Sequence, residues 1–95
     1  MPPKLTEGQI ADALAQLPGW SVVAGKLRRE FMFKDFARAW AFLSAVALAA
    51  EKMDHHPDWS NSWNKVTIEL TTHSAGGLTQ NDFSLASKIN ALFGA

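Results

Sequence analysis

One apolar stretch restricts the fold of this chain more than any other feature. Residues 39–50 are apolar at every position except Ser44. The run is shorter than the ~20 residues that a membrane-spanning helix needs. Asp35 is a good N-cap before it, and Pro57 stops a helix after it. We therefore predict one long helix over residues 36–53 inside a globular protein.

This helix would be apolar on more than one side. Two stripes repeat along it at helical spacing. The first contains Phe36, Trp40, Leu43, Ala47 and Ala50, and the second contains Ala39, Phe42, Val46, Ala49 and Met53. One small core cannot cover both stripes. We expect the first to pack on a sheet and the second to form a contact between subunits.

Two capping boxes mark the starts of two further helices. Thr6 and Gln9 have the spacing at which each side chain reaches the other residue's backbone N–H, which predicts a helix over residues 5–17. Thr79 and Asp82 repeat this spacing before the last helix. Asp82 thus has a purely structural explanation, because an acid is favoured at the third position of such a helix.

Four segments have the composition and alternation of β-strands, in two pairs joined by short turns. Short turns between consecutive strands favour an antiparallel sheet with helices on one side. We predict an α+β fold in which residues 1–95 form a single domain. Its element order is αββαββα, with a four-stranded antiparallel sheet and three helices packed on one face. The predicted strands are residues 20–23, 27–33, 59–63 and 66–73.

Charge and composition argue against several classes of partner. Nine Lys and Arg residues balance nine Asp and Glu residues, whereas a nucleic-acid-binding protein normally has a basic excess. The N-terminal residues lack the apolar stretch of a signal peptide, so we expect a cytoplasmic protein without membrane contact. The sequence has no cysteine for a disulfide. Association of subunits is therefore the expected source of extra stability in so small a domain.

All three histidines lie between residues 55 and 73, and imidazole is the side chain best suited to proton transfer near neutral pH. Pro57 fixes the backbone after His55 and His56, so their rings should point in different directions. The pair also has a structural explanation, because histidines at a helix C-terminus bind its free carbonyls. His73 is expected at the end of a strand, either as an exposed polar position or facing a flat ligand.

Two other chemistries use histidine. A zinc site would need the three imidazoles to converge, but adjacent histidines in an extended segment project oppositely and rarely bind one ion. The carboxylate partners typical of zinc enzymes are also not apparent. A Ser-His-Asp hydrolase lacks support, because the sequence has no nucleophile elbow motif. We therefore expect no metal.

The histidines belong to a longer pattern. Residues 51–59 read Glu-Lys-Met-Asp-His-His-Pro-Asp-Trp, residues 70–79 read Leu-Thr-Thr-His-Ser-Ala-Gly-Gly-Leu-Thr, and Asp82 follows. With Asn61 and residues 63–66, this pattern resembles the signature of the pterin-4a-carbinolamine dehydratase family across essentially the whole chain. The resemblance implies dehydration of 4a-hydroxytetrahydropterin, the product left by aromatic amino acid hydroxylases, to quinonoid dihydropterin. It also implies that no metal or other cofactor takes part.

The resemblance further implies which residues form the site. Position by position, it makes His55, His56 and His73 the catalytic histidines, and we expect His56 to be the main acid and base. The pterin would be bound by these histidines together with Asp54, Pro57, Thr72, Ser74, Ala75 and Asp82. Animal members can carry an arginine where this chain has Asn81, and this difference bears on the fine substrate affinity. They can also carry a cysteine where this chain has Ala75, and neither difference removes a histidine.

Family members form homodimers and homotetramers through the long helix, and the resemblance implies a functional coupling to an aromatic amino acid hydroxylase. In animals they also bind a transcription factor as a dimerisation cofactor. A protein-binding module is therefore the alternative to an enzyme. The three retained histidines favour the enzyme, because a scaffold has no physical need for them.

Overall fold

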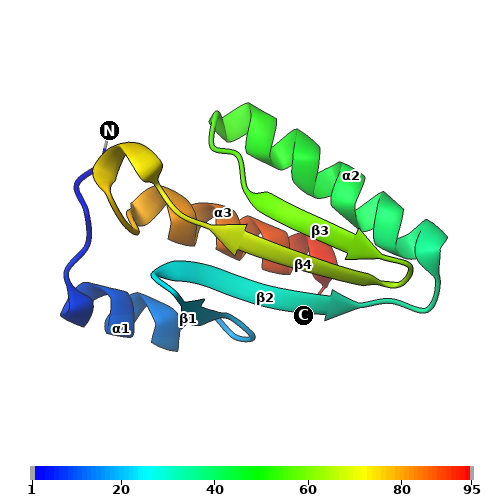
Figure 1. The fold of residues 1–95 in the computed structure, drawn as a ribbon, viewed down its shortest axis with the longest axis horizontal. Helices are drawn as coiled ribbons and strands as arrows, with labels where there is room; N and C mark the ends of the chain where they lie inside the picture. The colour runs from blue at the N-terminus through cyan, green and yellow to red at the C-terminus, as the bar shows by residue number, and fades with distance from the viewer. Residues whose placement is uncertain (1, 95) are drawn as a thin grey trace.

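The computed structural model describes residues 2–94 of the chain (Figure 1). The described elements follow the predicted order αββαββα, with one short 3₁₀ helix added before the last α-helix. They are α1 (Glu7–Ala15), β1 (Ser21–Val23), β2 (Lys26–Met32), α2 (Phe36–Met53), β3 (Asp58–Ser62), β4 (Lys65–Leu70), η1 (His73–Ala75) and α3 (Gln80–Phe93).

The four strands form one antiparallel sheet in the order β1-β2-β4-β3. In its central pair Phe31 lies opposite Val66, and both side chains are buried. The Phe31 ring packs on Phe42 of α2 and Phe93 of α3, so this is the face that the helices cover. Successive residues alternate between faces, so the other face of the sheet is polar. Its charged residues include Lys26, Arg28, Glu30, Asp58 and Glu69. The predicted sheet with helices on one side is confirmed.

Side-chain caps begin the helices where the sequence predicts them. The Thr6 side chain accepts from the Gln9 N–H at 3.1 Å, and the Gln9 side chain accepts from the Thr6 N–H at 2.9 Å. Asp35 caps α2 by accepting from the Arg38 N–H at 2.9 Å. Each cap satisfies backbone donors that would otherwise lack a partner. Helix α2 therefore has the predicted bounds.

The predicted division of α2 into a core stripe and an interface stripe is wrong. The buried residues of α2 are Ala39, Phe42, Leu43, Val46 and Ala50, so most of the expected interface stripe lies in the core. Phe42, for example, packs on the rings of Phe31 and Phe33, with centroid distances of 4.8 and 5.0 Å. Phe36 and Trp40 from the expected core stripe are instead about half exposed. The sheet contacts α2 along a line between the two stripes.

Strand β4 ends earlier than predicted, and this moves His73 off the strand. The strand stops at Leu70, and Thr72 then forms an isolated bridge to Gly77. Between them the chain turns through η1, which is closed by Gly76 at φ 75°. Glycine tolerates this left-handed conformation without steric cost. His73 therefore begins a tight turn instead of ending a strand.

A polar cluster joins the C-terminal helix to the first hairpin. Asn90 accepts hydrogen bonds from Trp20 Nε1 and from Arg29, both at 2.7 Å, and donates to the Pro18 carbonyl at 3.0 Å. The Arg29 guanidinium also lies over the Phe31 ring, 4.5 Å from its centroid, and burial lowers the pKa of this group. The cluster fixes α3 relative to the sheet and so supports the site at the other end of α3.

Among the described residues, α2 is the longest helix, and neither it nor any other helix is long and apolar enough to cross a bilayer.

Candidate active site

The site begins where α2 ends. Asp54 adopts the left-handed conformation, with φ 51° and ψ 42°, and so terminates the helix. Aspartate is one of the few non-glycine residues that occupy this region with some frequency. The His55 N–H still bonds to the Ala50 carbonyl at 3.1 Å, which anchors the first residue after the helix. The turn at Asp54 sets the directions of the two histidines that follow.

His55 points inward toward α3. Its side chain is only 12% exposed, and its Nε2 atom lies 2.6 Å from Oδ1 of Asp82. Asp82 lies in the first turn of α3 and is completely buried. The contact therefore joins the end of one helix to the start of another through a side-chain pair that is largely shielded from water.

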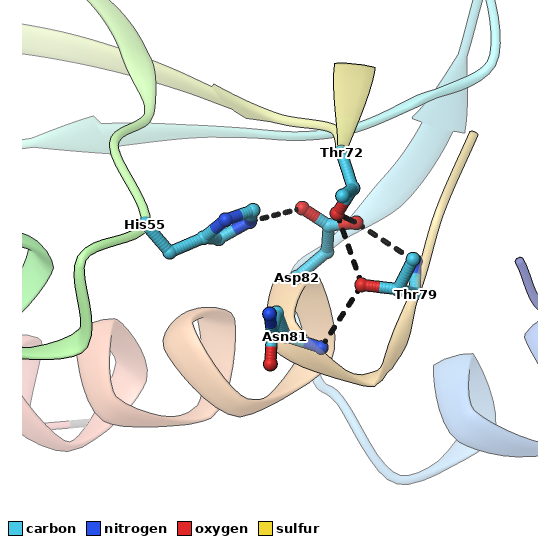
Figure 2. A network of polar contacts seen from close by, with 5 residues as sticks. All are labelled: His55, Thr72, Thr79, Asn81 and Asp82. Atoms are coloured by element: carbon cyan, nitrogen blue, oxygen red, sulfur yellow. Dashed lines mark hydrogen bonds and ion pairs between the residues drawn. The ribbon is translucent and has the colours of Figure 1, made fainter. Parts of the chain in front are cut away.

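Asp82 also lies at the centre of a threonine network (Figure 2). Its Oδ2 atom accepts from the Thr79 backbone N–H at 2.9 Å and from the Thr72 hydroxyl at 2.8 Å. The hydroxyls of Thr72 and Thr79 lie 2.9 Å apart. The predicted capping box is therefore confirmed, and the same carboxylate that caps α3 also holds His55.

His56 points away from this network. Its side chain is 57% exposed, and its Nε2 atom lies 2.8 Å from Oε1 of Glu51 on the last turns of α2. The prediction that the adjacent imidazoles point in different directions is confirmed. Glu51 did not appear among the predicted site residues. The five-residue separation from His56 is not a helical pairing distance, and it becomes a contact only because Asp54 leaves the helix.

The other predicted site residues lie next to these groups along the chain. Thr72 touches Asp82 directly, and η1 follows it, with His73 and Ser74 exposed and Ala75 half-buried. Asp54 and Pro57 flank the two adjacent histidines. The structure thus joins His55, Thr72 and Asp82 by hydrogen bonds. It adds Thr79, which the sequence indicated only as a helix cap.

The chemistry open to this arrangement is proton transfer. It presents two exposed imidazoles, His56 and His73, and one shielded imidazole that is paired with a buried carboxylate. In residues 2–94, no three His, Cys, Asp or Glu side chains gather as a group that could hold a metal ion. Imidazoles in different environments can serve as acid and base in one reaction.

Comparison with known proteins decides the family. The family model described as pterin 4 alpha carbinolamine dehydratase matches residues 3–92. The chain belongs to this family. A relative from Solibacter usitatus, which has the provisional name pterin-4-alpha-carbinolamine dehydratase, is 52% identical over 92 residues, covering 97% of each chain. A relative from Synechococcus sp. WH7803 with the same provisional name is 58% identical over 76 residues, covering 80% of this chain and 82% of its own.

Two solved structures share the fold. A crystal structure described as a transcriptional coactivator/pterin dehydratase from Brucella melitensis superposes with a TM-score of 0.91 at 45% identity, covering 94% of this chain and 97% of its own. A pterin dehydratase-like protein described as a RuBisCO assembly factor in the alpha-carboxysome gives a TM-score of 0.66 at 26% identity, covering 80% and 88%. The fold therefore occurs in proteins that are described by an enzymatic role and by an assembly role.

Proposed function

We propose that this chain is a lyase that converts 4a-hydroxytetrahydropterin to quinonoid dihydropterin and water, in the recycling of tetrahydrobiopterin for aromatic amino acid hydroxylases. One observation carries the proposal beyond family membership. His55 and His56 are adjacent in the chain, yet each is held by a different carboxylate, and one is shielded while the other is exposed. Such a pair can divide the two proton transfers that the reaction requires.

The reaction breaks the C4a–O bond and forms a double bond between C4a and N5. The N5 lone pair expels the hydroxyl group, which leaves as water after it receives a proton. N5 then loses its own proton, so one group must act as an acid and another as a base. Positioned imidazoles contribute about 10²–10⁴-fold to such transfers.

In this proposal His56 is the main acid and base, because its imidazole is exposed to an incoming ligand and is oriented by Glu51. His55 and His73 share the transfers and help to bind the pterin. The remaining pterin-binding positions are Asp54, Pro57, Thr72, Ser74 and Ala75. The sequence predicts Asp82 among them as well, but its side chain is completely buried and lies beside the site in contact with His55. No cofactor takes part.

The wider setting is also part of the proposal. Residues 1–95 form one domain that works in the cytoplasm as a homodimer or homotetramer, in functional coupling with an aromatic amino acid hydroxylase. Helix α2 offers a surface for subunit association, because Phe36 and Trp40 stack on each other with ring centroids 6.2 Å apart and Leu48 is 74% exposed. Covering exposed apolar side chains such as these with a second subunit lowers the free energy of the complex.

A stopped-flow assay with enzymatically generated 4a-hydroxytetrahydropterin tests the activity. The protein should accelerate the appearance of quinonoid dihydropterin well above the buffer rate. The matched control is the double variant His56→Ala/His73→Ala, which alters only exposed side chains and should be folded but nearly inactive. A wild-type rate equal to that of the double variant would reject the dehydratase.

A protein-binding role is the second candidate, and the exposed Phe36–Trp40 pair on α2 favours it. The solved relatives described as a coactivator and as an assembly factor make such a role reasonable for this fold. One variant distinguishes the dehydratase from the protein-binding role. A Trp40→Glu variant should keep the dehydratase rate per folded site if catalysis lies with the histidines, whereas a protein-binding role on α2 should be lost.

A further inference from the structure

Asp82 has no surface left for a ligand. The residue is completely buried, and both of its carboxylate oxygens are already occupied. Oδ1 faces His55, and Oδ2 accepts from the Thr79 N–H and from the Thr72 hydroxyl. A substrate in the site could reach this carboxylate only if the capping box opened. Any contribution of Asp82 to catalysis must therefore pass through a neighbouring residue.

The hydrogen bonds of this network all have the same donor-to-acceptor order, which ends at Asp82. The Asn81 N–H donates to the Thr79 hydroxyl oxygen at 3.2 Å. A hydroxyl group has a single proton, and that of Thr72 is used on Asp82, so the Thr79 hydroxyl must donate to Thr72. Every donor in the chain thus points toward the Asp82 carboxylate.

Because the Asp82 carboxylate only accepts hydrogen bonds in this network, its contact with His55 determines which ring nitrogen of His55 carries the proton. An ionised carboxylate is only an acceptor, so the 2.6 Å contact with Oδ1 requires the proton of the neutral imidazole to be on Nε2. The other ring nitrogen, Nδ1, is then free of a proton. We propose that Asp82 is a positioning residue that holds His55 in its Nε2–H form, so that Nδ1 is the nitrogen available to accept a proton from the pterin.

The proposal rests on the proposed dehydratase function, and its energetic logic is simple. When Nδ1 takes up a proton, the imidazole becomes a cation whose other N–H already faces the Asp82 carboxylate. A buried carboxylate stabilises such a cation without any rearrangement. His55 thereby gains a base role that an untethered imidazole, free to present either nitrogen, would perform less well.

An Asp82→Asn substitution tests the tautomer directly. The Thr79 backbone N–H is an obligatory donor, so the single oxygen of the new amide must take the place of Oδ2. Its NH₂ group then faces His55 Nε2, which has to become an acceptor. The imidazole proton moves to Nδ1, and the catalytic nitrogen is blocked. The capping contact to Thr79 is kept, so the variant should fold.

Two readouts on the wild type, Asp82→Asn and the control Asp12→Asn on the exposed side of α1 complete the test. Two-bond ¹H–¹⁵N NMR spectra should show His55 as Nε2–H in the wild type and control and as Nδ1–H in Asp82→Asn. The dehydration kcat of Asp82→Asn should fall by roughly tenfold and by no more than in His55→Ala, because the misplaced proton disables that one imidazole. The Kd of a pterin analogue should change less than threefold.

Three outcomes of these measurements would overturn the proposed role of Asp82. A wild-type His55 in the Nδ1–H form would overturn the proposal even if the variant failed to fold. So would an Asp82→Asn variant with the proton on Nδ1 and an undiminished kcat, or one with a large loss of pterin binding at unchanged kcat. The proposed function fails separately, if the wild type shows no dehydration at all while the NMR spectra still report the tautomer.

Discussion

The imidazole of His56 folds back onto the helix that it has just left, and its Nε2 atom lies 2.8 Å from Oε1 of Glu51. The left-handed turn at Asp54 makes this contact possible, because it reverses the chain immediately after α2. Both side chains are more than half exposed. An exposed pair of this kind contributes about 0–1 kcal/mol to the free energy of unfolding. Glu51 can therefore orient His56 without immobilising it.

Glu51→Ala should reduce the dehydration kcat by roughly fivefold, which corresponds to the loss of an interaction near 1 kcal/mol. Glu51→Gln should lose less, because its amide oxygen can still accept from the ring. The melting temperature should hardly change in either variant. Glu30→Gln on the polar face of the sheet is the control and should retain the full rate. A Glu51→Ala enzyme with wild-type kcat would show that His56 needs no partner.

Replacing the histidines one at a time should give unequal losses. His56→Ala should lower kcat most, by roughly 10²-fold or more, and His55→Ala and His73→Ala less, because the other imidazoles can still move a proton. The double variant His56→Ala/His73→Ala should approach the uncatalysed rate, with deficits that do not add. Stopped-flow traces on folded protein provide the measurement. Near-normal turnover by His56→Ala would contradict the assignment of the main acid and base.

The three single histidine variants should also differ in folding stability, in a different order from their effects on kcat. His55→Ala removes the partner of the buried Asp82 Oδ1, and an unsatisfied buried acceptor costs about 1–3 kcal/mol. His56→Ala and His73→Ala change exposed side chains and should leave the unfolding midpoint in urea almost unaltered. Equal midpoints for all three variants would mean that the His55–Asp82 contact contributes little to folding.

Local signals in the sequence predicted most of the fold. Asp35, the capping box of Thr6 and that of Thr79 each define a helix start by a contact within three residues, so the start can be derived without knowing the rest of the chain. The burial of α2 could not be derived in this way. Apolar residues almost surround that helix, and its buried line depends on where the sheet lies, which is a long-range property.

In the site, too, the sequence predicted the local features but not the long-range contacts. The sequence predicted that His55 and His56 diverge, because Pro57 acts on the adjacent residues. It did not predict the pairing of His55 with Asp82, which lies 27 positions away and already had a sufficient explanation as part of a helix cap. The alternation extends to residue 73 and therefore predicts a strand there, whereas the bridge from Thr72 to Gly77 turns the chain earlier.

Removal of metal ions should not affect the reaction. Among residues 2–94 no three His, Cys, Asp or Glu side chains converge where they could hold one ion, and the rings of His55 and His56 point to different carboxylates. Dialysis against a strong chelator, followed by the dehydration assay, should therefore leave kcat within error of the untreated protein. A large loss of rate that added zinc restores would contradict the proposed proton-transfer mechanism.

Two substitutions on α2 should separate folding from assembly. Val46 is completely buried, so Val46→Glu places a charge in the core and should unfold the chain, because an unpaired buried charge is strongly unfavourable. Trp40 is 55% exposed, so Trp40→Glu should fold normally but weaken any contact between subunits on that face. Circular dichroism measures the first effect and sedimentation velocity the second. If Trp40→Glu has the same mass in solution as the wild type, the subunit contact lies elsewhere, and if Val46→Glu folds as well, the core position of that residue is wrong.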